Sequence, residues 1–552
     1  MCRLKNILIL KITMRLFICA TLVLLVVNGF PPKKTELIEL SVIHINDFHA
    51  RYEETNLDSG LCKTLNCIGG FSRLFASVMK ILQDKPQSIL LNAGDNFEGT
   101  LWYDVHKWNV TQYFFNKLPT DAFTLGNHEF EDKIAGLVPF LEHLKAPVVV
   151  SNIDASGEPS IQNLFNKSVV IERHGLKIGI IGVILSTINE IADIGNLILL
   201  NESESVNKEA ERLVKEEGVF TNIVLSHCGY DVEKAIAANS TSKISLVVGG
   251  HTHSFLYTGD PVPGTDIPVG PYPTVVENNE GKKVLVVQAS SYTKYLGNIR
   301  VSYNQKGEVV NWTGAPLFMD NNLPQDKKIN EELQPWKKKV DENESNRIIG
   351  RTMVRLEQSS CPMAECLMGN FITDAMVFAY LDSPEPGTWT NASIAMMHAG
   401  GLRSGIDVGD INYFEAVSVA PFNNTIDLGE IQGKHLKEIL ESSTTDDGIT
   451  LLQVAGLRVV YNLTMPEGSR VTSLQIRCRN CTVPIYENLD NERIYRVVLP
   501  SFLAEGGFGF TLFKKYFKYR QIGGLDRELF VKYVECKSPI FQEIEGRIII
   551  NR

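Results

Sequence analysis

The chain has 552 residues, of which 44% are hydrophobic and 21% charged, and its formal net charge is −10. This is the composition of a globular protein with enough apolar residues for two sizeable cores, so we expect two or more domains. The negative charge excludes nucleic acid as a general partner, because a phosphate backbone binds basic surfaces.

Residues 1–28 have the composition of a secretory signal peptide. They contain four basic residues and no acid, and their apolar run LFICATLVLLVV (16–27) is too short for a comfortable membrane span. Met14 is an alternative start, because the sequence from there is already a compact signal. Removal of the four basic residues takes the formal charge from −10 to −14. We therefore expect a secreted, extracellular protein.

Eight cysteines remain after residue 28, and six of them form three close pairs: Cys62/Cys67, Cys361/Cys366 and Cys478/Cys481. In an oxidising compartment such pairs indicate local disulfides. The last pair also resembles a redox motif or half of a zinc site, but the other half is missing, which favours a disulfide. Cys228 and Cys536 are left over. Ten N-x-[ST] sequons also fit a glycosylated secretory protein.

The C-terminal sequence FQEIEGRIIINR lacks the small-residue site, polar spacer and hydrophobic tail of a lipid anchor. We expect a soluble mature protein without a membrane anchor.

The chain divides into two patterned regions joined by a charged segment. Residues 29–325 alternate short β-rich runs, such as ELSVIHIND and QSILLNAGD, with helical or loop segments, which predicts an α/β layered domain. Residues 326–350 are highly charged and contain Pro335, so they predict a solvated helical linker. Residues 351–552 form a second domain, with a helix predicted at CLMGNFITDAMVFAYL and strands at GLRVVYNL, VTSLQIRC and RIYRVVLP.

Five predicted strands of the first region end in side chains that can bind metal. The candidates are Asp47 and His49, Asp95, Asn127 and His128, His227, and His251 and His253. Each motif alone is ambiguous, since an Asp after a strand is most often a turn or a helix cap. Five such strand ends in one domain favour a metal site, because ligands bind at the strand ends of an α/β sheet.

The type of ligand indicates the type of ion. Oxygen and imidazole ligands without thiolate suit Zn²⁺, Mn²⁺ or Mg²⁺. A carboxylate such as Asp95 can bridge two ions about 3.5–4 Å apart, the arrangement that clamps both ends of a phosphoryl displacement. The period of a strand would place His251 and His253 on the same side of the chain.

The order D-x-H, GD, GNHE, H, GHxH resembles the calcineurin-like metallophosphoesterases. The further motifs GGFSRL, ECLMGNFITDAM, GGLRSGI, APFNNT and SFLAEGGFGF resemble the 5'-nucleotidase and apyrase family, over nearly the whole mature chain. Within it, the chain looks most like the secreted salivary apyrases of blood-feeding insects. The resemblance implies an α/β fold, with an N-terminal four-layer α/β/β/α metallophosphoesterase domain and a C-terminal α+β nucleotide-binding domain.

The resemblance also implies roles for the metal-binding motifs. Two divalent ions, Zn, Mn, Mg or Ca, are expected: one held by Asp47, His49, Asp95 and His253, the other by Asp95, Asn127, His227 and His251. His128 would lie over the phosphate and stabilise charge, with Asn127 beside the substrate. The family usually has Asp three residues after this His, whereas this chain has Glu131 followed by Asp132, and either can reach.

The second domain is expected to hold the nucleotide. By resemblance, Arg403 binds phosphate, and Phe422 and Phe502 stack on the base, although either Phe can equally be a core residue. The chain departs from the family at three positions: Pro362 replaces an arginine near the phosphate, His398 replaces the Asn that contacts the base, and Phe508 replaces the Asp that contacts ribose.

Three functions fit this sequence. The first is a secreted apyrase that hydrolyses extracellular ATP and ADP to AMP and phosphate, which would suppress ADP-driven platelet aggregation in a host. The second is a soluble 5'-nucleotidase acting on AMP. The third is a non-catalytic protein that binds nucleotides or host haemostatic proteins, which the altered pocket keeps open.

Overall fold

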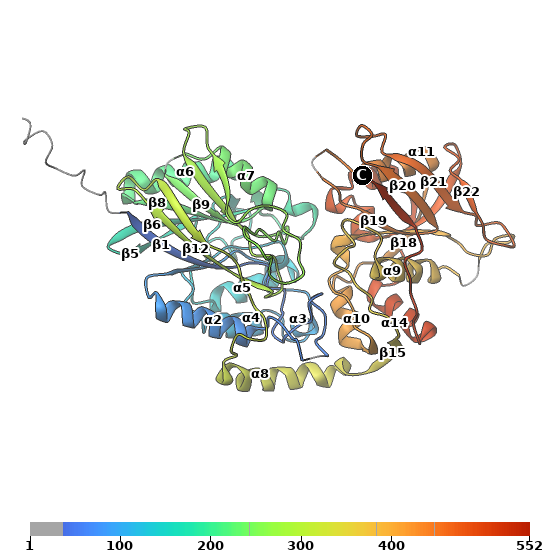
Figure 1. The fold of residues 1–552 in the computed structure, drawn as a ribbon, viewed down its shortest axis with the longest axis horizontal. Helices are drawn as coiled ribbons and strands as arrows, with labels where there is room; N and C mark the ends of the chain where they lie inside the picture. The colour runs from blue at the N-terminus through green and yellow to red at the C-terminus, as the bar shows by residue number, and fades with distance from the viewer. Residues whose placement is uncertain (1–36, 64, 242, 382–383, 447) are drawn as a thin grey trace, which may run out of the picture.

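The computed structural model describes residues 37–63, 65–241, 243–381, 384–446 and 448–552. The predicted signal peptide lies outside the described residues. Two domains lie side by side, and one long helix runs beneath the first and leads to the second (Figure 1).

The first domain is built on two sheets. The first sheet has the order β13-β12-β1-β2-β3, with β14 paired to β12, and β1, β2 and β3 are parallel. Its strands are β1 (Ile38–Ile45), β2 (Ile89–Asn92), β3 (Ala122–Phe123), β12 (Tyr295–Tyr303), β13 (Val309–Gly314) and β14 (Leu317–Phe318).

The second sheet has the order β10-β11-β9-β8-β6-β5, with β6, β8, β9 and β11 parallel. Its strands are β5 (Ser168–Arg173), β6 (Leu176–Ile184), β8 (Thr221–His227), β9 (Ile244–Val248), β10 (Thr274–Glu277) and β11 (Lys283–Val287). A separate short pair joins β4 (Ile153–Asp154) and β7 (Ile198–Leu199).

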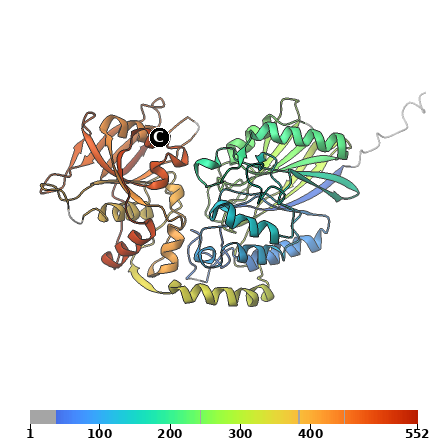
Figure 2. The same cartoon turned by 180° about the vertical axis from the view of Figure 1, so that it is seen from behind.

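The two sheets pack face to face and helices cover their outer faces. Val42 and Leu91 of the first sheet meet Ile223 and Leu246 of the second in one buried cluster. The first sheet is covered by α2 (Phe71–Asp84), α3 (Leu101–His106), α4 (Trp108–Phe115) and α5 (Lys133–His143), and the second by α6 (Glu202–Arg212) and α7 (Tyr230–Ala238) (Figures 1 and 2). The predicted four-layer α/β/β/α domain is confirmed.

Helix α8 (Lys327–Val340) lies in the charged segment but is not solvated all round. It continues through Pro335, and Ile329 and Leu333 on one face are buried against the first domain. The ring of Trp336 lies 4.9 Å from that of His106. The apolar residues recur at helical spacing, so this amphipathic stripe packs, while Lys337 pairs with Glu53 and the other lysines are exposed.

The second domain combines a five-stranded sheet with a four-stranded one. The orders are β19-β16-β23-β18-β24 and β22-β21-β20-β25, and β15 pairs with β17. The strands are β15 (Ile348–Thr352), β16 (Ile394–His398), β17 (Gly409–Asn412), β18 (Ile426–Gln432), β19 (Leu452–Ala455), β20 (Leu457–Asn462), β21 (Val471–Arg477), β22 (Tyr486–Asn488), β23 (Ile494–Pro500), β24 (Lys518–Gln521) and β25 (Ile548–Asn551).

The five-stranded sheet is antiparallel except between β16 and β23, which agrees with the predicted α+β class, and helices cover both of its faces. One face packs on α9 and α14, and the other packs on α11, α13 and the four-stranded sheet. The helices are α9 (Leu367–Phe378), α10 (Tyr413–Val419), α11 (Gly433–Glu441), α12 (Ser501–Ala504), α13 (Thr511–Tyr516) and α14 (Asp526–Lys537).

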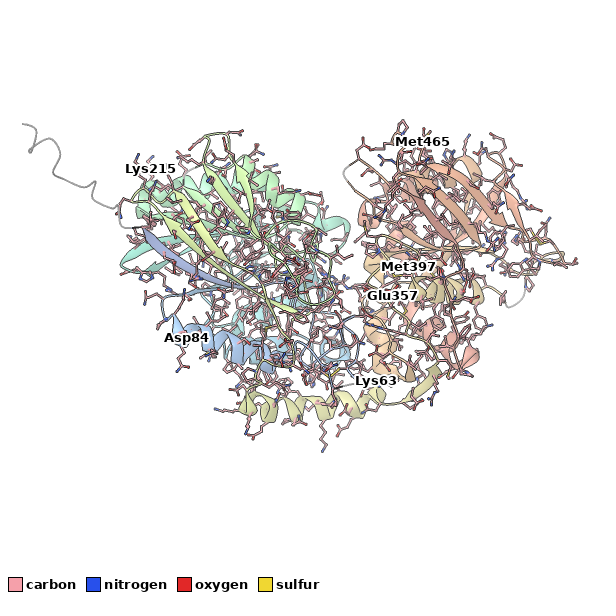
Figure 3. All side chains as sticks on the ribbon, viewed as in Figure 1. Lys63, Asp84, Lys215, Glu357, Met397 and Met465 are labelled. Atoms are coloured by element: carbon pink, nitrogen blue, oxygen red, sulfur yellow. A yellow bond between two sulfur atoms is a disulfide. The ribbon has the colours of Figure 1, made fainter. Side chains whose placement is uncertain are left out.

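Polar contacts join the two domains. Lys63, labelled in Figure 3, forms an ion pair with Glu415 at 2.8 Å. Arg527 of α14 pairs with Asp104 of α3 at 2.7 Å. These contacts join α10 and α14 of the second domain to α3 and to the loop between β1 and α2 of the first.

The three predicted disulfides form: Cys62–Cys67, Cys361–Cys366 and Cys478–Cys481. Cys228 is buried and free, and Cys536 is exposed and free. Among the described helices, none combines the length and apolar character that crossing a bilayer requires.

Candidate functional site

The loops that follow β1, β2, β3, β8 and β9 converge at one edge of the paired sheets. Strands β1, β2 and β3 are parallel neighbours, as are β8 and β9, so their carboxyl ends meet there. At that edge the backbone takes the left-handed conformation at five predicted ligands: Asp47 (φ 51°), His49 (φ 49°), Asp95 (φ 54°), His251 (φ 78°) and His253 (φ 52°). Non-glycine residues pay about 1–3 kcal/mol each for such conformations, which are typical of functional sites.

Asp47, His49 and His253 form one group of ligand atoms. The Nε2 atoms of His49 and His253 lie 3.1 Å apart, and His253 Nε2 lies 3.3 Å from Asp47 Oδ1. Two imidazole nitrogens and a carboxylate oxygen that converge in this way fit one divalent ion.

Asp95, His227 and His251 form a second group. His227 Nε2 lies 3.1 Å from Asp95 Oδ2, while His227 Nδ1 donates to the carbonyl oxygen of Ala93 at 2.6 Å. That donation leaves the lone pair of Nε2 free to face an ion, as metal-binding histidines generally do. Asn127 Oδ1 lies 2.9 Å from His251 Nδ1, so it joins this group.

Asp95 lies between the two groups. Its Oδ2 is 3.1 Å from His227 Nε2 and 3.7 Å from His49 Nε2. Burial opposes its ionisation, but the imidazoles of His227 and His128 outweigh burial and hold the pKa of Asp95 well below its ordinary value. A permanently charged carboxylate placed there fits a bridge between two divalent ions.

His251 and His253 do not lie on one side of a strand, so that expectation is wrong. Strand β9 ends at Val248, and the chain then turns through Gly249 and Gly250 into left-handed residues. The two imidazoles therefore diverge, one toward Asn127 and the other toward Asp47.

His128 faces the same cluster and has an oriented ring. Its Nδ1 contacts Glu131 Oε1, whereas Asp132 accepts from Tyr103 Oη at 2.8 Å and Lys107 Nζ at 3.2 Å. Burial lowers the pKa of His128, but Asp95 and Glu131 outweigh it, so the pKa is raised. Of the two candidate carboxylates, Glu131 is the one in contact.

Two buried glutamates that the motif analysis did not single out hold the ligand loops together. Glu129 accepts from the backbone N–H groups of Asp95 (2.9 Å), Asn96 (2.7 Å) and Gly126 (2.6 Å). Glu233 accepts from the N–H of Gly250 at 3.0 Å, and burial raises its pKa to about 8. Glu129 is the last residue of the GNHE motif, so the sequence contained a signal that could have identified it.

Arg403 and Phe422 of the second domain reach this cluster. Arg403 Nη2 lies 2.9 Å from His49 Nε2 and 3.4 Å from His253 Nε2. The ring of Phe422 is stacked on that of His128, with centroids 5.5 Å apart. Residues about 350 positions apart in the chain thus form one site across the domain boundary.

Phe502, His398 and Phe508 form a separate group of rings. The His398 ring lies 5.2 Å from that of Phe502 and 5.0 Å from that of Phe508. Burial and then Arg403 lower the pKa of His398 to about 3, so the ring is neutral, and its buried Nδ1 has no partner among the described residues. Phe508 is 48% exposed and left-handed (φ 58°). Pro362 lies beside the Cys361–Cys366 disulfide and provides no charge.

Comparison with known proteins agrees with this geometry. Residues 40–255 match the calcineurin-like phosphoesterase model, and residues 348–515 match that of the 5'-nucleotidase C-terminal domain. The chain is 45% identical to an apyrase of Tabanus yao over 518 residues, which cover 93% of each chain. It belongs to the 5'-nucleotidase and apyrase family.

Other members of the 5'-nucleotidase and apyrase family match along most of their length. A 5'-nucleotidase of Rattus norvegicus is 38% identical over 523 residues, covering 92% of this chain and 90% of its own. The crystal structure of a 5'-nucleotidase precursor from Thermus thermophilus superposes with a TM-score of 0.81 at 33% identity, covering 93% of this chain and 99% of that one. The chain is a metal-dependent nucleotide phosphohydrolase.

Proposed function

We propose that this protein is a secreted apyrase that hydrolyses ATP and ADP to AMP and phosphate. The observation that carries the proposal is the position of Arg403 beside the ligand cluster, 2.9 Å from His49. A guanidinium on this side of the cluster can hold an inner phosphate, once it draws back from His49, while the terminal phosphate lies on the ions. The relatives from Tabanus yao and Aedes aegypti, at 45% and 38% identity, are both named apyrases.

The proposal includes two ions, held by the ligand groups that share Asp95. When bound, a pair of divalent ions supplies Lewis-acid stabilisation of phosphoryl oxygens and lowers the pKa of water. The candidate ions are Zn, Mn, Mg and Ca.

The side chains of the protein carry out the remaining tasks. A protonated His128, oriented by Glu131, stabilises the charge that develops on the transferred phosphoryl group and its leaving oxygen. Asn127 offers an amide to the same phosphoryl oxygens. Phe422 and Phe502 provide faces for the base, which tolerate any base because every base has a π face. His398 lies beside Phe502 and offers its unpartnered Nδ1 to the edge of the base.

The signal-like N-terminus, the sequons and the three disulfides support extracellular action. In a blood-feeding insect, secretion into saliva would bring the enzyme to host ADP and so suppress ADP-driven platelet aggregation. Removal of ADP in a platelet suspension, compared with an inactive Asp95→Asn variant, tests this role.

Hydrolysis of AMP is the competing activity. The 5'-nucleotidase of Rattus norvegicus is 38% identical to the chain, as is the apyrase of Aedes aegypti, so relatives alone do not choose between them. The decisive experiment measures kcat/KM for ATP, ADP and AMP with Ca²⁺, Mg²⁺ and Zn²⁺. We expect ATP and ADP to exceed AMP, with weak discrimination among bases. Fastest turnover of AMP would make the protein a soluble 5'-nucleotidase, and turnover of none would favour a binding protein.

A further inference from the structure

Four arginines are buried among the described residues, and Arg51 differs from the other three. Arg73, Arg470 and Arg547 each form an ion pair with a carboxylate, for example Arg547 with Asp374 at 2.7 Å. Arg51 is 2% exposed, and within the described residues no carboxylate lies within 4.0 Å of its guanidinium. Glu98 attracts Arg51, but without touching it. A buried cation with no carboxylate in contact is costly, and an anionic ligand would compensate it.

The guanidinium of Arg51 has unused hydrogen-bond donors. One nitrogen, Nη1, donates to the carbonyl oxygen of Gly99, but the buried Nε and Nη2 have no partner. Three or more N–H groups of a guanidinium can bind the oxygens of one phosphate in a planar fork.

Arg51 lies next to a second guanidinium that also lacks a carboxylate. The Cζ atoms of Arg51 and Arg403 lie 4.7 and 5.4 Å from the ring centroid of Tyr292. The ring attracts both cations, but they repel each other, and the buried Nε of Arg403 is also unpartnered. An anion between them would remove the repulsion and satisfy the free donors.

The position of this pair identifies the anion. Tyr292 contacts the rings of His49 (5.4 Å) and His253 (5.1 Å), so the two guanidinium groups lie at the edge of the first ligand group. Arg51 also borders a small cavity of about 10 Å³ whose lining includes Phe414 and Ser418 of the second domain. It therefore lies at the domain boundary, where a nucleotide would extend away from the ions.

We propose that Arg51 and Arg403 together bind the phosphate adjacent to the one on the metal ions, and that Arg51 thereby selects nucleoside di- and triphosphates over monophosphates. This inference rests on the proposed function, because it assigns a second phosphate to that same site. A monophosphate has no group that reaches Arg51 once its phosphate lies on the ions.

The test compares diphosphate with monophosphate ligands on the full-length, metal-loaded protein. In Arg51→Met we expect KM for ADP and the inhibition constant of pyrophosphate to rise about 10–100-fold, the effect of losing a charged hydrogen bond. KM for AMP and the inhibition constant of orthophosphate should change less than about 3-fold. Arg51→Lys keeps the charge without the fork and should give an intermediate pyrophosphate constant.

Arg73→Met is the matched control. Arg73 is also buried in the first domain, but it is paired with Glu54, so its loss should lower the thermal midpoint and leave all four constants unchanged. Equal effects of Arg51→Met on mono- and diphosphates, or no effect on either, would overturn the proposal. If Arg51→Met does not fold, the Lys variant decides by the same comparison. If the unmodified protein hydrolyses no nucleotide, the proposed function fails, whereas calorimetric titration with pyrophosphate still tests Arg51.

Discussion

Replacing Glu129 by Gln tests whether the ligand loops are held by one buried carboxylate. Glu129 is 1% exposed, and its two oxygens accept four hydrogen bonds: from the N–H groups of Asp95, Asn96 and Gly126, and from Asn96 Nδ2. A glutamine keeps one acceptor oxygen, so two of these donors then face an NH₂ group. Each lost bond to a charged acceptor costs about 1.5–3 kcal/mol, which gives about 3–6 kcal/mol in all.

We expect two measurable results. The first domain of Glu129→Gln should unfold at a lower temperature, and its affinity for the ions should fall about 10–100-fold because Asp95 is no longer held in place. Thermal unfolding without metal measures the loss of stability, and the further stabilisation on adding metal measures the loss of ion affinity. The transition of the first domain is followed on its own, because the two domains need not unfold together. Glu142→Gln is the control, because that side chain is exposed on α5. Unchanged unfolding and metal affinity in Glu129→Gln would refute the reasoning.

Three further predictions concern the reaction itself. Asp95→Asn should abolish turnover, since a neutral amide bridges two cations poorly, and near-normal phosphate release from the metal-loaded variant would contradict a bridging role. His128→Ala should keep both ions by elemental analysis and lose about 10²-fold or more in kcat, whereas loss of an ion would make His128 a ligand. Glu131→Gln should shift the alkaline limb of the pH profile of kcat/KM to lower pH. The reason is that Glu131 raises the pKa of His128, and activity is lost as the pH rises through that pKa. Asp132→Asn is the control and should leave the alkaline limb in place.

The sequence predicts which residues gather at the site, because their positions follow from strand ends. A strand that ends in Asp, Asn or His is readable from its apolar run, and parallel neighbours bring such ends to one edge. The sequence does not predict how the loops turn. His251 and His253 diverge because the backbone enters the left-handed region, which favours glycine and is not expected of histidine.

Local geometry also decides between Glu131 and Asp132, which the sequence leaves open. His128 begins a short 3₁₀ turn, His128–Phe130, in which residues three apart lie on one face. Glu131 therefore returns to His128, while Asp132 points toward Tyr103. The packing of α8 differs from the solvated helix that the sequence predicts. Most residues of α8 are polar or charged, and its few apolar residues form a stripe only when the segment is read at helical spacing.

The contact between Arg403 and His49 was beyond sequence reasoning, and it constrains how the site must work. A divalent ion bound by His49 would lie about 2.0–2.1 Å from its nitrogen, whereas Arg403 Nη2 lies 2.9 Å from that same atom. If His49 binds an ion, the ion and a phosphate do not both fit between them, so Arg403 would move away from His49 in the loaded site. The ion pairs Lys63–Glu415 and Arg527–Asp104 lie at this boundary and would rearrange with such a movement. Separation of the domains by a few ångströms then lets a phosphate chain replace the direct contact, with Arg403 retained as its partner.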